Sequence, residues 1–407
     1  MSCEIFAALV FTFPGWRFFV LVLAATPLAY YIAATFAAWR FFSRVRARAL
    51  PSYTPAASLL KPVHGVDFGS YKNFASFCTQ DYPEYEILFG VGDKGDAAVP
   101  LIQRLMAEFP QKRINLLVGA ERIGANRKVN MQARLAREAR HEILVLTDGD
   151  IRVSRNYLRE VIAPLADRKV GAVTSFYRGI AEKNLGAELE AIGAASDFFA
   201  GVLMANWMEG MTFGLGASIV TTKEWVARIG GFAAIADLLA DDYELGNRIA
   251  NAGGKVFLSR EVVATMYPTQ SPHSFWQHQV RWTRTVRLSR PLSFVGLIFT
   301  HGLPWALLAA LIAPTVQIGA EYLMAYLVLR LTMAWTVGVW GVRDDVVRRK
   351  LWLVPLRDAI YFVVWLASFT SNRIHWGGED YIMRRGRLVP IMTSQSPDAG
   401  GASEARR

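Results

Sequence analysis

Long apolar stretches without charge occur towards both ends of the chain and are missing from its middle. The first covers residues 18–39, FFVLVLAATPLAYYIAATFAAW, and has no charged side chain over 22 positions. A helix of about 20 apolar residues crosses the hydrocarbon core of a bilayer, and a proline inside it is tolerated. A cleaved signal peptide is the alternative, but the stretch is longer than a typical h-region, lacks a clear basic n-region and has no convincing small-residue cleavage site. We therefore predict a transmembrane anchor at residues 18–39.

Basic residues follow this anchor directly. They are Arg40, Arg44, Arg46 and Arg48. Because positive charge accumulates on the cytoplasmic side of membrane helices, the following domain is expected in the cytoplasm and residues 1–17 outside it. Cys3 and Cys78 would then lie on opposite sides of the membrane, so no disulfide framework is expected.

The C-terminal third contains further apolar segments, at residues 292–318, 322–342 and 353–370. The first two are long enough to span a bilayer. The third contains Arg357 and Asp358, and both an interfacial or re-entrant position and a crossing remain open for it. Three crossings would place residues 373–407 outside, whereas the basic run RIHWGGEDYIMRRGR favours the inside. We expect membrane segments within residues 291–372, one of them non-spanning, and a polar, partly disordered tail on the inside.

The middle of the chain, residues 51–290, alternates between short apolar runs and amphipathic helical patterns. This alternation predicts an α/β domain with a largely parallel sheet covered by helices, two of them near residues 97–109 and 128–139. The expected strands are ASLLKPV (57–63), YEILFGV (85–91), RINLLVG (113–119), EILVLTD (142–148) and VGAVTSF (170–176). In such sheets ligands bind beyond the carboxyl ends of the strands. Polar residues at these ends are therefore the candidates for a site.

Charge and motif content exclude several function classes. The net charge is +11, but many arginines lie beside the apolar segments, where basic clusters attract anionic lipid. The lipid bilayer is therefore the expected partner, and nucleic acid is not. No GxxxxGK[ST], complete GxGxxG or HExxH motif is present, so P-loop, dinucleotide and zinc-hydrolase sites are not indicated. Phosphate charge would have to be met by a metal ion and by basic side chains, for which Lys61, Arg127 and Lys128 are available.

Acidic residues end two of the expected strands. Asp93 follows YEILFGVG, and Asp148-Gly149-Asp150 follows EILVLT. Both positions are also ordinary turn sequences, and this alternative is the stronger one for Asp93 alone. Two carboxylates two residues apart after a buried strand can bind a divalent cation together with the phosphates it carries, and their hard oxygen ligands suit Mg²⁺ or Mn²⁺.

A third acidic site lies at ADDY, residues 240–243, in front of a short amphipathic helix. Helix capping explains one of the two aspartates, Asp241 or Asp242. The other can point into a site as a general base, with Asp242 the stronger candidate.

The run HSFWQHQVRWTRTVR, residues 273–287, adjoins the second group of apolar segments. If it is helical, His278, Arg281, Trp282 and Thr285 share one face, with Gln277 beside them. That face can bind a ligand, or it can simply anchor the helix at lipid headgroups.

The order of these motifs resembles a known signature. Asp93, Asp148-Gly-Asp150, ADDY and HQVRW are similar to the D, DxD, (T/A)ED and (Q/R)xxRW motifs of inverting, membrane-integrated, family-two-like glycosyltransferases. More narrowly, LKPVHGVD, QDYPEYEILFGVGD, GANRKVN and DGDIRV resemble the ceramide glucosyltransferase-like family, including bacterial hopanoid-associated glycosyltransferases. The resemblance implies a nucleotide-sugar-binding α/β fold of the glycosyltransferase A type, with transmembrane helices at both ends.

The resemblance also implies roles for the donor side of the site. Asp93 would hold the uracil and ribose of a UDP-sugar, and Asp148 and Asp150 the metal, Mg²⁺ or Mn²⁺, and the diphosphate. The basic side chains Lys61 and Lys128 are expected to contact the same donor.

On the acceptor side, the resemblance implies that Asp242 deprotonates the acceptor hydroxyl. Arg281 and Trp282 would close over the diphosphate and the acceptor entrance at the membrane face. His278 departs from the Q/R of the signature, so its contact with the donor is expected to be weaker and pH-sensitive.

The function implied by the resemblance is transfer of one hexose, with inversion, from a UDP-sugar to the hydroxyl of a membrane lipid. UDP-glucose and ceramide are the expected pair. The alternatives are a hopanoid or other lipid acceptor with UDP-GlcNAc or UDP-glucose, a processive polysaccharide synthase, and a non-catalytic nucleotide-sensing membrane protein. The expected location is a bacterial-type inner membrane, with the catalytic domain, residues 51–290, in the cytoplasm.

Overall fold

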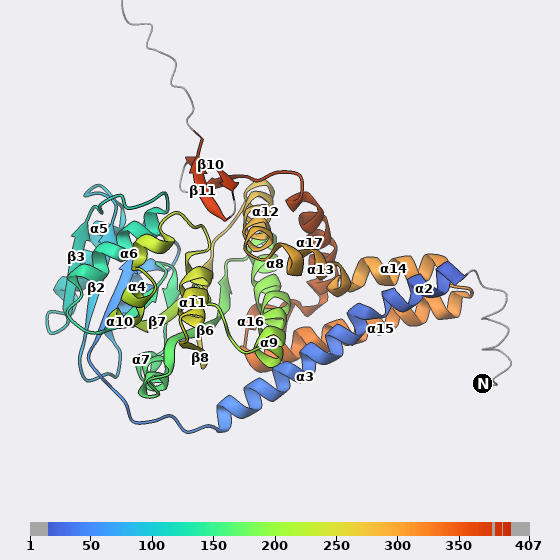
Figure 1. The fold of residues 1–407 in the computed structure, drawn as a ribbon, viewed down its shortest axis with the longest axis horizontal. Coiled ribbons are helices and arrows are strands. Elements are labelled where there is room, and N and C mark those ends of the chain that lie inside the picture. Colours follow the sequence, from blue (N-terminus) through green and yellow to red (C-terminus); the bar gives the residue numbers. More distant parts are fainter. Residues whose placement is uncertain (1–14, 377–378, 385, 392–407) are drawn as a thin grey trace, which may run out of the picture.

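The computed structural model describes residues 15–376, 379–384 and 386–391 (Figure 1). The expectations for most of the N-terminal segment 1–17, including Cys3, and for the final residues 392–407 lie outside the described residues. A sheet-based domain occupies one end of the molecule, and long helices extend from it at the other end.

The sheet-based domain is built on one sheet of eight strands in the order β3-β2-β1-β4-β7-β6-β8-β5. Strands β3, β2, β1 and β4 are parallel to one another, whereas β7 runs antiparallel to both β4 and β6. The sheet is therefore mixed rather than largely parallel. The strands are β1 Ala57–Pro62, β2 Tyr85–Val91, β3 Arg113–Val118, β4 Ile143–Thr147, β5 Ile151–Arg152, β6 Val170–Ala181, β7 Ser218–Thr222 and β8 Lys255–Tyr267.

Side chains of successive strand residues pack into two hydrophobic cores, one on each face of the sheet. Leu59 belongs to one core and Leu60 to the other, as expected for side chains that alternate across a strand. Helices α4 (Ser70–Cys78), α5 (Ala98–Glu108) and α7 (Tyr157–Ile162) cover the first face, and α6 (Arg127–Glu138) packs on the second.

The helices at the two ends of the chain meet in space. At the N-terminal end, α2 (Gly15–Ala24) and α3 (Thr26–Ala47) form one long apolar unit, and α2 packs against α14 (Gly302–Ile312) and α3 against α15 (Val316–Ala334). Further helices are α13 Pro291–Gly296, α16 Asp345–Lys350 and α17 Val354–Ser368. Within the described residues three helices are long and apolar enough to cross a membrane, Gly15–Ala47, Val316–Gly341 and Asp345–Ser368.

The broken segment is not the one that the sequence singled out. Residues 291–312 form two helices bent by 49° at His301, whereas the segment with Arg357 and Asp358 satisfies the length and composition of a span. The physical reason is that Asp358 is neutralised inside the bundle. It accepts hydrogen bonds from Arg330 at 2.9 Å and from Tyr326 at 2.9 Å.

The sheet-based domain also packs on the apolar helices. Helices α8 (Leu185–Gly193) and α9 (Phe199–Met208) are joined by a π-helical turn, Ala194–Phe198, and α9 packs against α3. The rings of Phe36 and Trp207 are 5.6 Å apart across this contact. The segment 51–290 is therefore in direct contact with the apolar helices.

Within the described part of the tail, residues 373–390 form a small antiparallel sheet of three strands, which the sequence did not predict: β9 Arg373–Trp376, β10 Glu379–Arg384 and β11 Arg387–Pro390. Ile374, Tyr381 and Leu388 bury one face of it. The amide of Leu388 donates to the carbonyl of Asp237 at 2.7 Å. Figure 1 shows these strands between the sheet-based domain and α12 (Pro272–Ser289).

Candidate active site

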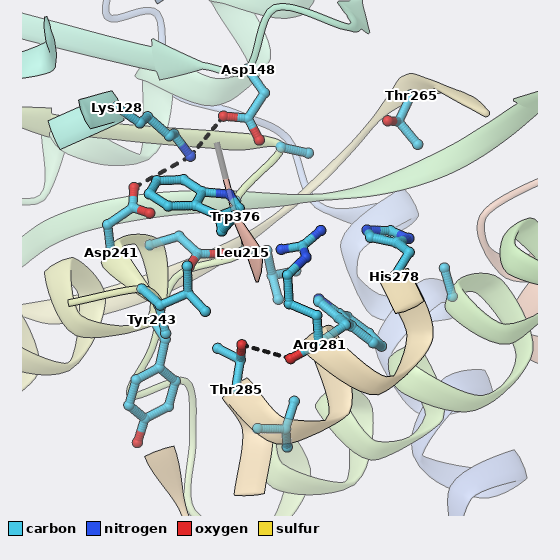
Figure 2. A pocket seen from close by; sticks show the side chains of 18 of the residues that line it. Lys128, Asp148, Leu215, Asp241, Tyr243, Thr265, His278, Arg281, Thr285 and Trp376 are labelled. Atoms are coloured by element: carbon cyan, nitrogen blue, oxygen red, sulfur yellow. Dashed lines mark hydrogen bonds and ion pairs between the residues drawn. The ribbon is translucent and has the colours of Figure 1, made fainter. Parts of the chain in front are cut away.

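A single cavity of about 1810 Å³ lies between the sheet edge, α12, the apolar helices and the tail strands. It contains Asp93, Asp148, Asp150, Asp242 and Arg281, which are far apart in the sequence. The sequence-predicted face of α12 therefore does turn towards the carboxyl ends of the strands. Figure 2 shows the Asp148 side and the α12 side of this cavity facing each other.

Lys128 connects two of the acidic motifs. Its ammonium lies 2.7 Å from Asp148 Oδ1 and 3.3 Å from Asp241 Oδ2 (Figure 2). Burial by itself would lower the pKa of Lys128, but the carboxylates of Asp148, Asp241 and Asp242 raise it well above the ordinary value. Lys128 is positioned by Asn126, whose side chain caps α6 by accepting from the amide of Val129. The ammonium is thus a fixed positive charge within the acidic cluster.

Asp150 lies on the other side of the same turn. Its Oδ2 accepts a hydrogen bond of 2.6 Å from the Thr265 hydroxyl on β8. Burial and the nearby charge of Asp148 raise the pKa of Asp150 to about 6. Crowded carboxylates of this kind are stabilised by any cation bound between them.

Lys61 occupies a different place from the one expected. Its side chain is 1% exposed, does not line the cavity, and donates at 2.7 Å to the backbone carbonyl of Asp148. Burial lowers the pKa of Lys61 to about 7, against the charges of Asp150 and Asp148. In this position Lys61 holds the acidic turn from behind and makes no contact in the cavity itself.

Asp242 lies beside Asp148 across a glycine. A Cβ placed on Gly216 would be 2.7 Å from Asp242 Oδ2 and 3.7 Å from Asp148 Oδ2. A Cβ on Gly214 would meet the Asp242 carbonyl at 2.6 Å. The fragment GLGAS is therefore a loop that lets the start of α11 (Asp241–Asn251) approach the sheet edge closely.

Neither aspartate caps α11, contrary to the sequence interpretation. The N-cap is Ala240, which makes no side-chain bond, because both aspartates lie in the first turn and point elsewhere. Asp241 faces Lys128. Burial and the neighbouring Asp241 charge raise the pKa of Asp242 to about 6.

Arg281 points from α12 into the cavity (Figure 2). Burial lowers its pKa, and the carboxylate of Glu190 partly opposes this effect. Among the described residues its guanidinium makes no hydrogen bond or ion pair that fixes it. A largely buried guanidinium without an anionic partner is suited to binding a phosphate.

The neighbours of Arg281 on α12 have partners inside the protein. His278 Nδ1 lies 2.7 Å from Glu190 Oε1, and the ring of Trp282 meets that of Phe198 edge-on at 4.9 Å. Both still line the cavity. Glu190 was not identified from the sequence, and its position on α8 is fixed only by tertiary packing.

Asp93 lines the far end of the cavity, where its side chain is exposed and accepts from the amide of Gly95 at 2.8 Å. This local hydrogen bond is typical of a turn, which was the alternative interpretation of Asp93 from the sequence. Trp376 from β9, which was not identified from the sequence, also lines the cavity and is labelled in Figure 2. The apolar alternation of RIHW was the available signal for it.

The mixed sheet, its acidic edge and the attached apolar helices together match the glycosyltransferase class that the sequence indicated. A family model described as Glycosyl transferase family 21 matches residues 19–389, and the chain belongs to this family. The expected ceramide glucosyltransferase-like family is thereby confirmed, and so is the α/β glycosyltransferase A-type fold class with apolar helices at both ends.

Curated relatives are ceramide glucosyltransferases. Ceramide glucosyltransferase 3 of Caenorhabditis elegans is 28% identical over 234 residues, which are 57% of this chain and 51% of that protein. Ceramide glucosyltransferase 1 of the same organism is 23% identical over 370 residues, 85% of this chain and 77% of that protein. The match thus spans about half the length of the first relative and most of the second.

Among solved structures, a mannosyltransferase from Pyrobaculum calidifontis, in complex with GDP-Man and Mn²⁺, matches with a TM-score of 0.48 and 18% identity. The match covers 85% of this chain and 99% of that one. GalNAc-T7 with UDP, GalNAc and Mn²⁺ matches with a TM-score of 0.41 and 13% identity, over 59% of this chain and 51% of that one.

Proposed function

We propose that this protein transfers one glucose, with inversion, from UDP-glucose to the hydroxyl of a membrane lipid such as ceramide. The observation that carries the proposal is the single cavity in which Asp148, Asp242 and Arg281 face one space that continues among apolar helices. A water-soluble donor and a lipid acceptor can therefore meet without either leaving its own phase. Family membership and the ceramide glucosyltransferases among the relatives support this choice of substrates.

Asp242 is the proposed general base. The acceptor hydroxyl gives its proton to the Asp242 carboxylate while its oxygen bonds to the anomeric carbon, and the bond from that carbon to the diphosphate oxygen breaks. A base works best when its pKa is close to the operating pH, and a value of about 6 leaves Asp242 ionised at neutral pH but still basic. Asp241 is less suited because Lys128 already neutralises it.

Asp148 and Asp150 are proposed to hold a divalent cation together with the donor diphosphate. Within the described residues no group of three or more His, Cys, Asp and Glu could hold a metal ion alone. A pair of carboxylates nevertheless fits Mg²⁺ or Mn²⁺, because these ions complete their coordination with phosphate and water oxygens. Such an ion would supply positive charge to the departing diphosphate.

Arg281 and Lys128 are proposed to stabilise the same developing charge. A guanidinium can bind two phosphate oxygens at once, and Arg281 has no other anionic bond among the described side chains. Lys128 adds an ammonium beside Asp148. Positive groups fixed in a buried site stabilise the transition state without reorganising during the reaction.

The remaining sequence-predicted residues receive roles at the two ends of the cavity. Asp93 is proposed to bind the uracil and ribose, and Trp282 to line the acceptor entrance. His278, bonded to Glu190, is proposed to contact the donor only weakly.

The catalytic domain is proposed to face the cytoplasm, where UDP-sugars are made available, with the chain anchored in a bacterial-type inner membrane. The arginines that follow the first apolar helix support this orientation. In a Cys3→Ser background, a cysteine introduced at Lys94 is expected to resist a membrane-impermeant thiol reagent in whole cells and to react in open membrane vesicles. Labelling in whole cells would reverse the orientation.

The experiment that tests the activity is UDP release by the purified full-length protein with UDP-glucose and defined acceptors. We expect release that depends on N-acylsphingosine and a product carrying a single hexose. A polymeric product would identify a processive synthase, and donor binding without any release would identify a nucleotide sensor. Lipid analysis of a deletion strain would then show which native acceptor, ceramide or a hopanoid, loses its sugar.

A further inference from the structure

Charged side chains line the helical end of the cavity and take no part in the chemistry above. Beyond Trp282 the cavity continues between α3, α8 and α17, where Tyr30, Asp197, Arg357 and Tyr361 line it. Helices α3 and α17 belong to segments apolar enough to cross a membrane. Charge in such surroundings is costly, and it is usually retained because it binds a ligand or a partner group.

Arg357 has hydrogen-bonding capacity left over. Its side chain is only 3% exposed, and its centre lies 4.5 Å from the ring of Tyr361. Within the described part of the chain its one hydrogen bond is a long contact of 3.4 Å from Nη2 to Gln279, and Nε has no partner. A guanidinium has five N–H donors, so most of them remain free at a buried position that faces the cavity.

The position of this guanidinium depends on a glycine of α8. A Cβ on Gly193 would lie 2.4 Å from Arg357 Nε and 2.5 Å from Nη2. The guanidinium therefore lies directly against the helix backbone. An alanine at this helical position has no backbone strain, but it would displace the Arg357 head while leaving its charge unchanged.

Asp197 approaches the same end of the cavity from the π-helical turn Ala194–Phe198. Across the described residues its carboxylate forms no hydrogen bond and no ion pair. The turn is fixed from behind, because Arg330 Nη1 donates to the Ser196 carbonyl at 3.1 Å while the same guanidinium pairs with Asp358 at 2.9 Å. Turns of this type inside helices are frequent at functional sites.

We propose that Asp197 and Arg357 form a subsite for the head of the acceptor lipid, an inference that rests on the proposed function. The guanidinium donates to a carbonyl or hydroxyl oxygen, and the carboxylate accepts from a hydroxyl or an N–H. Because the two charges are opposite, the subsite suits an uncharged head that carries both a donor and an acceptor. Asp197 disfavours a phosphate head. These two residues thereby select the acceptor and leave the donor untouched.

The test compares Asp197→Asn and Gly193→Ala with wild type in the full-length protein, using radiolabelled N-hexanoylsphingosine as the acceptor probe. Arg349→Gln, an exposed arginine outside the cavity, is the matched control. Binding of the probe, binding of UDP-glucose and UDP release are measured separately. We expect both cavity variants to bind the probe about ten-fold more weakly, as for one lost hydrogen bond to a charged group. Their affinity for UDP-glucose and all values for Arg349→Gln should stay unchanged.

Unchanged probe affinity in both cavity variants would overturn the subsite. An equal loss of probe and UDP-glucose binding would also overturn it, because that result indicates a structural role. A different result would contradict the proposed function itself: wild type would bind UDP-glucose and the probe but release no UDP. Competition by undecaprenyl phosphate better than by dioctanoylglycerol would contradict the preference for an uncharged head.

Discussion

The two ends of the cavity handle charge in opposite ways. At the sheet edge, Asp148, Asp241 and Asp242 crowd around Lys128, so negative charge is in excess there. At the helical end, Asp197 and Arg357 carry one charge of each sign and few bonds, in front of the fully paired Arg330 and Asp358. An excess of carboxylates favours binding of a cation, and the cation in turn binds a donor that carries phosphate. A pair of opposite charges with free hydrogen-bonding groups favours binding of a neutral polar group. Under the proposed function, this difference would let the cavity separate its two substrates by charge.

Removal of divalent cations should have the largest effect on the acidic end. Excess EDTA is expected to abolish transfer, and added Mn²⁺ or Mg²⁺ to restore it, because the crowded carboxylates and the diphosphate would otherwise repel each other. UDP release measured with and without chelator checks this. Full activity in excess EDTA would show that Lys128 and Arg281 suffice without a metal ion.

Asp242→Asn should lower turnover by about 10²–10⁴-fold, the usual contribution of a general base. The affinity for UDP-glucose should remain close to wild type, since the amide keeps the shape of the carboxylate. Glu244→Gln, on the same helix but outside the cavity, is the control and should retain normal turnover. Near-normal turnover of Asp242→Asn would remove Asp242 from the mechanism.

Arg281→Lys tests whether the α12 guanidinium binds the donor diphosphate in the cavity. We expect turnover to fall about ten- to a hundredfold, equivalent to one charged hydrogen bond of about 1.5–3 kcal/mol. A point charge cannot reproduce the planar fork of the guanidinium. Arg287→Lys, on the same helix and outside the cavity, is the comparison. If both variants keep wild-type turnover when chemistry is limiting, α12 only anchors the protein at headgroups.

Trp282→Ala should act on the acceptor alone. The KM for N-hexanoylsphingosine is expected to rise about two- to tenfold, as for an aromatic contact of about 0.5–1.5 kcal/mol. UDP-glucose affinity should not change. An equal loss of affinity for both substrates would place Trp282 at the donor instead.

The smallest expected effect is a displaced pH profile. Below about pH 6, kcat/KM of wild type should fall ten-fold per pH unit, because Asp242 must be ionised to accept a proton. The neighbouring charge of Asp241 helps to raise this pKa, so Asp241→Asn should move the acidic limb to lower pH. If the acidic limb of Asp241→Asn lies at the same pH as that of wild type, the limb reports the titration of another group, such as Asp150.

The sequence was most informative where local pattern determines structure. The strand YEILFGV was predicted at its observed bounds, β2 Tyr85–Val91, because its apolar, β-branched and aromatic residues fit a strand buried on both faces. The antiparallel insertion of β7 was missed, since strand direction depends on partners far away in the chain. The same holds for Glu190 and Trp376, which reach the cavity only through tertiary packing.

Position within the site was harder to predict than chemical type. Lys61 has the residue type expected near phosphate, but it is buried behind the strand and supports Asp148 from there. Helix capping by Asp241 or Asp242 was expected from the local sequence. It does not occur, and Asp241 instead forms a salt bridge with Lys128. Arg357 and Asp358 looked unfavourable for a span because the sequence does not show that Arg330 pairs with Asp358 in the folded protein.

The strands of the tail connect the cavity to a part of the chain that follows the apolar helices. Leu388 in β11 donates to the Asp237 carbonyl, and the Asp237 side chain in turn accepts from the amide of Ala125, just before the helix that carries Lys128. These bonds join a part of the chain that follows α17 to loops that precede α12. The contribution of the tail to this bracing can form only after α17 has been synthesised, because β11 follows that helix in the chain. A chain that stopped after α17 would lack this brace and Trp376, so the lining of the cavity is complete only when the tail strands are present.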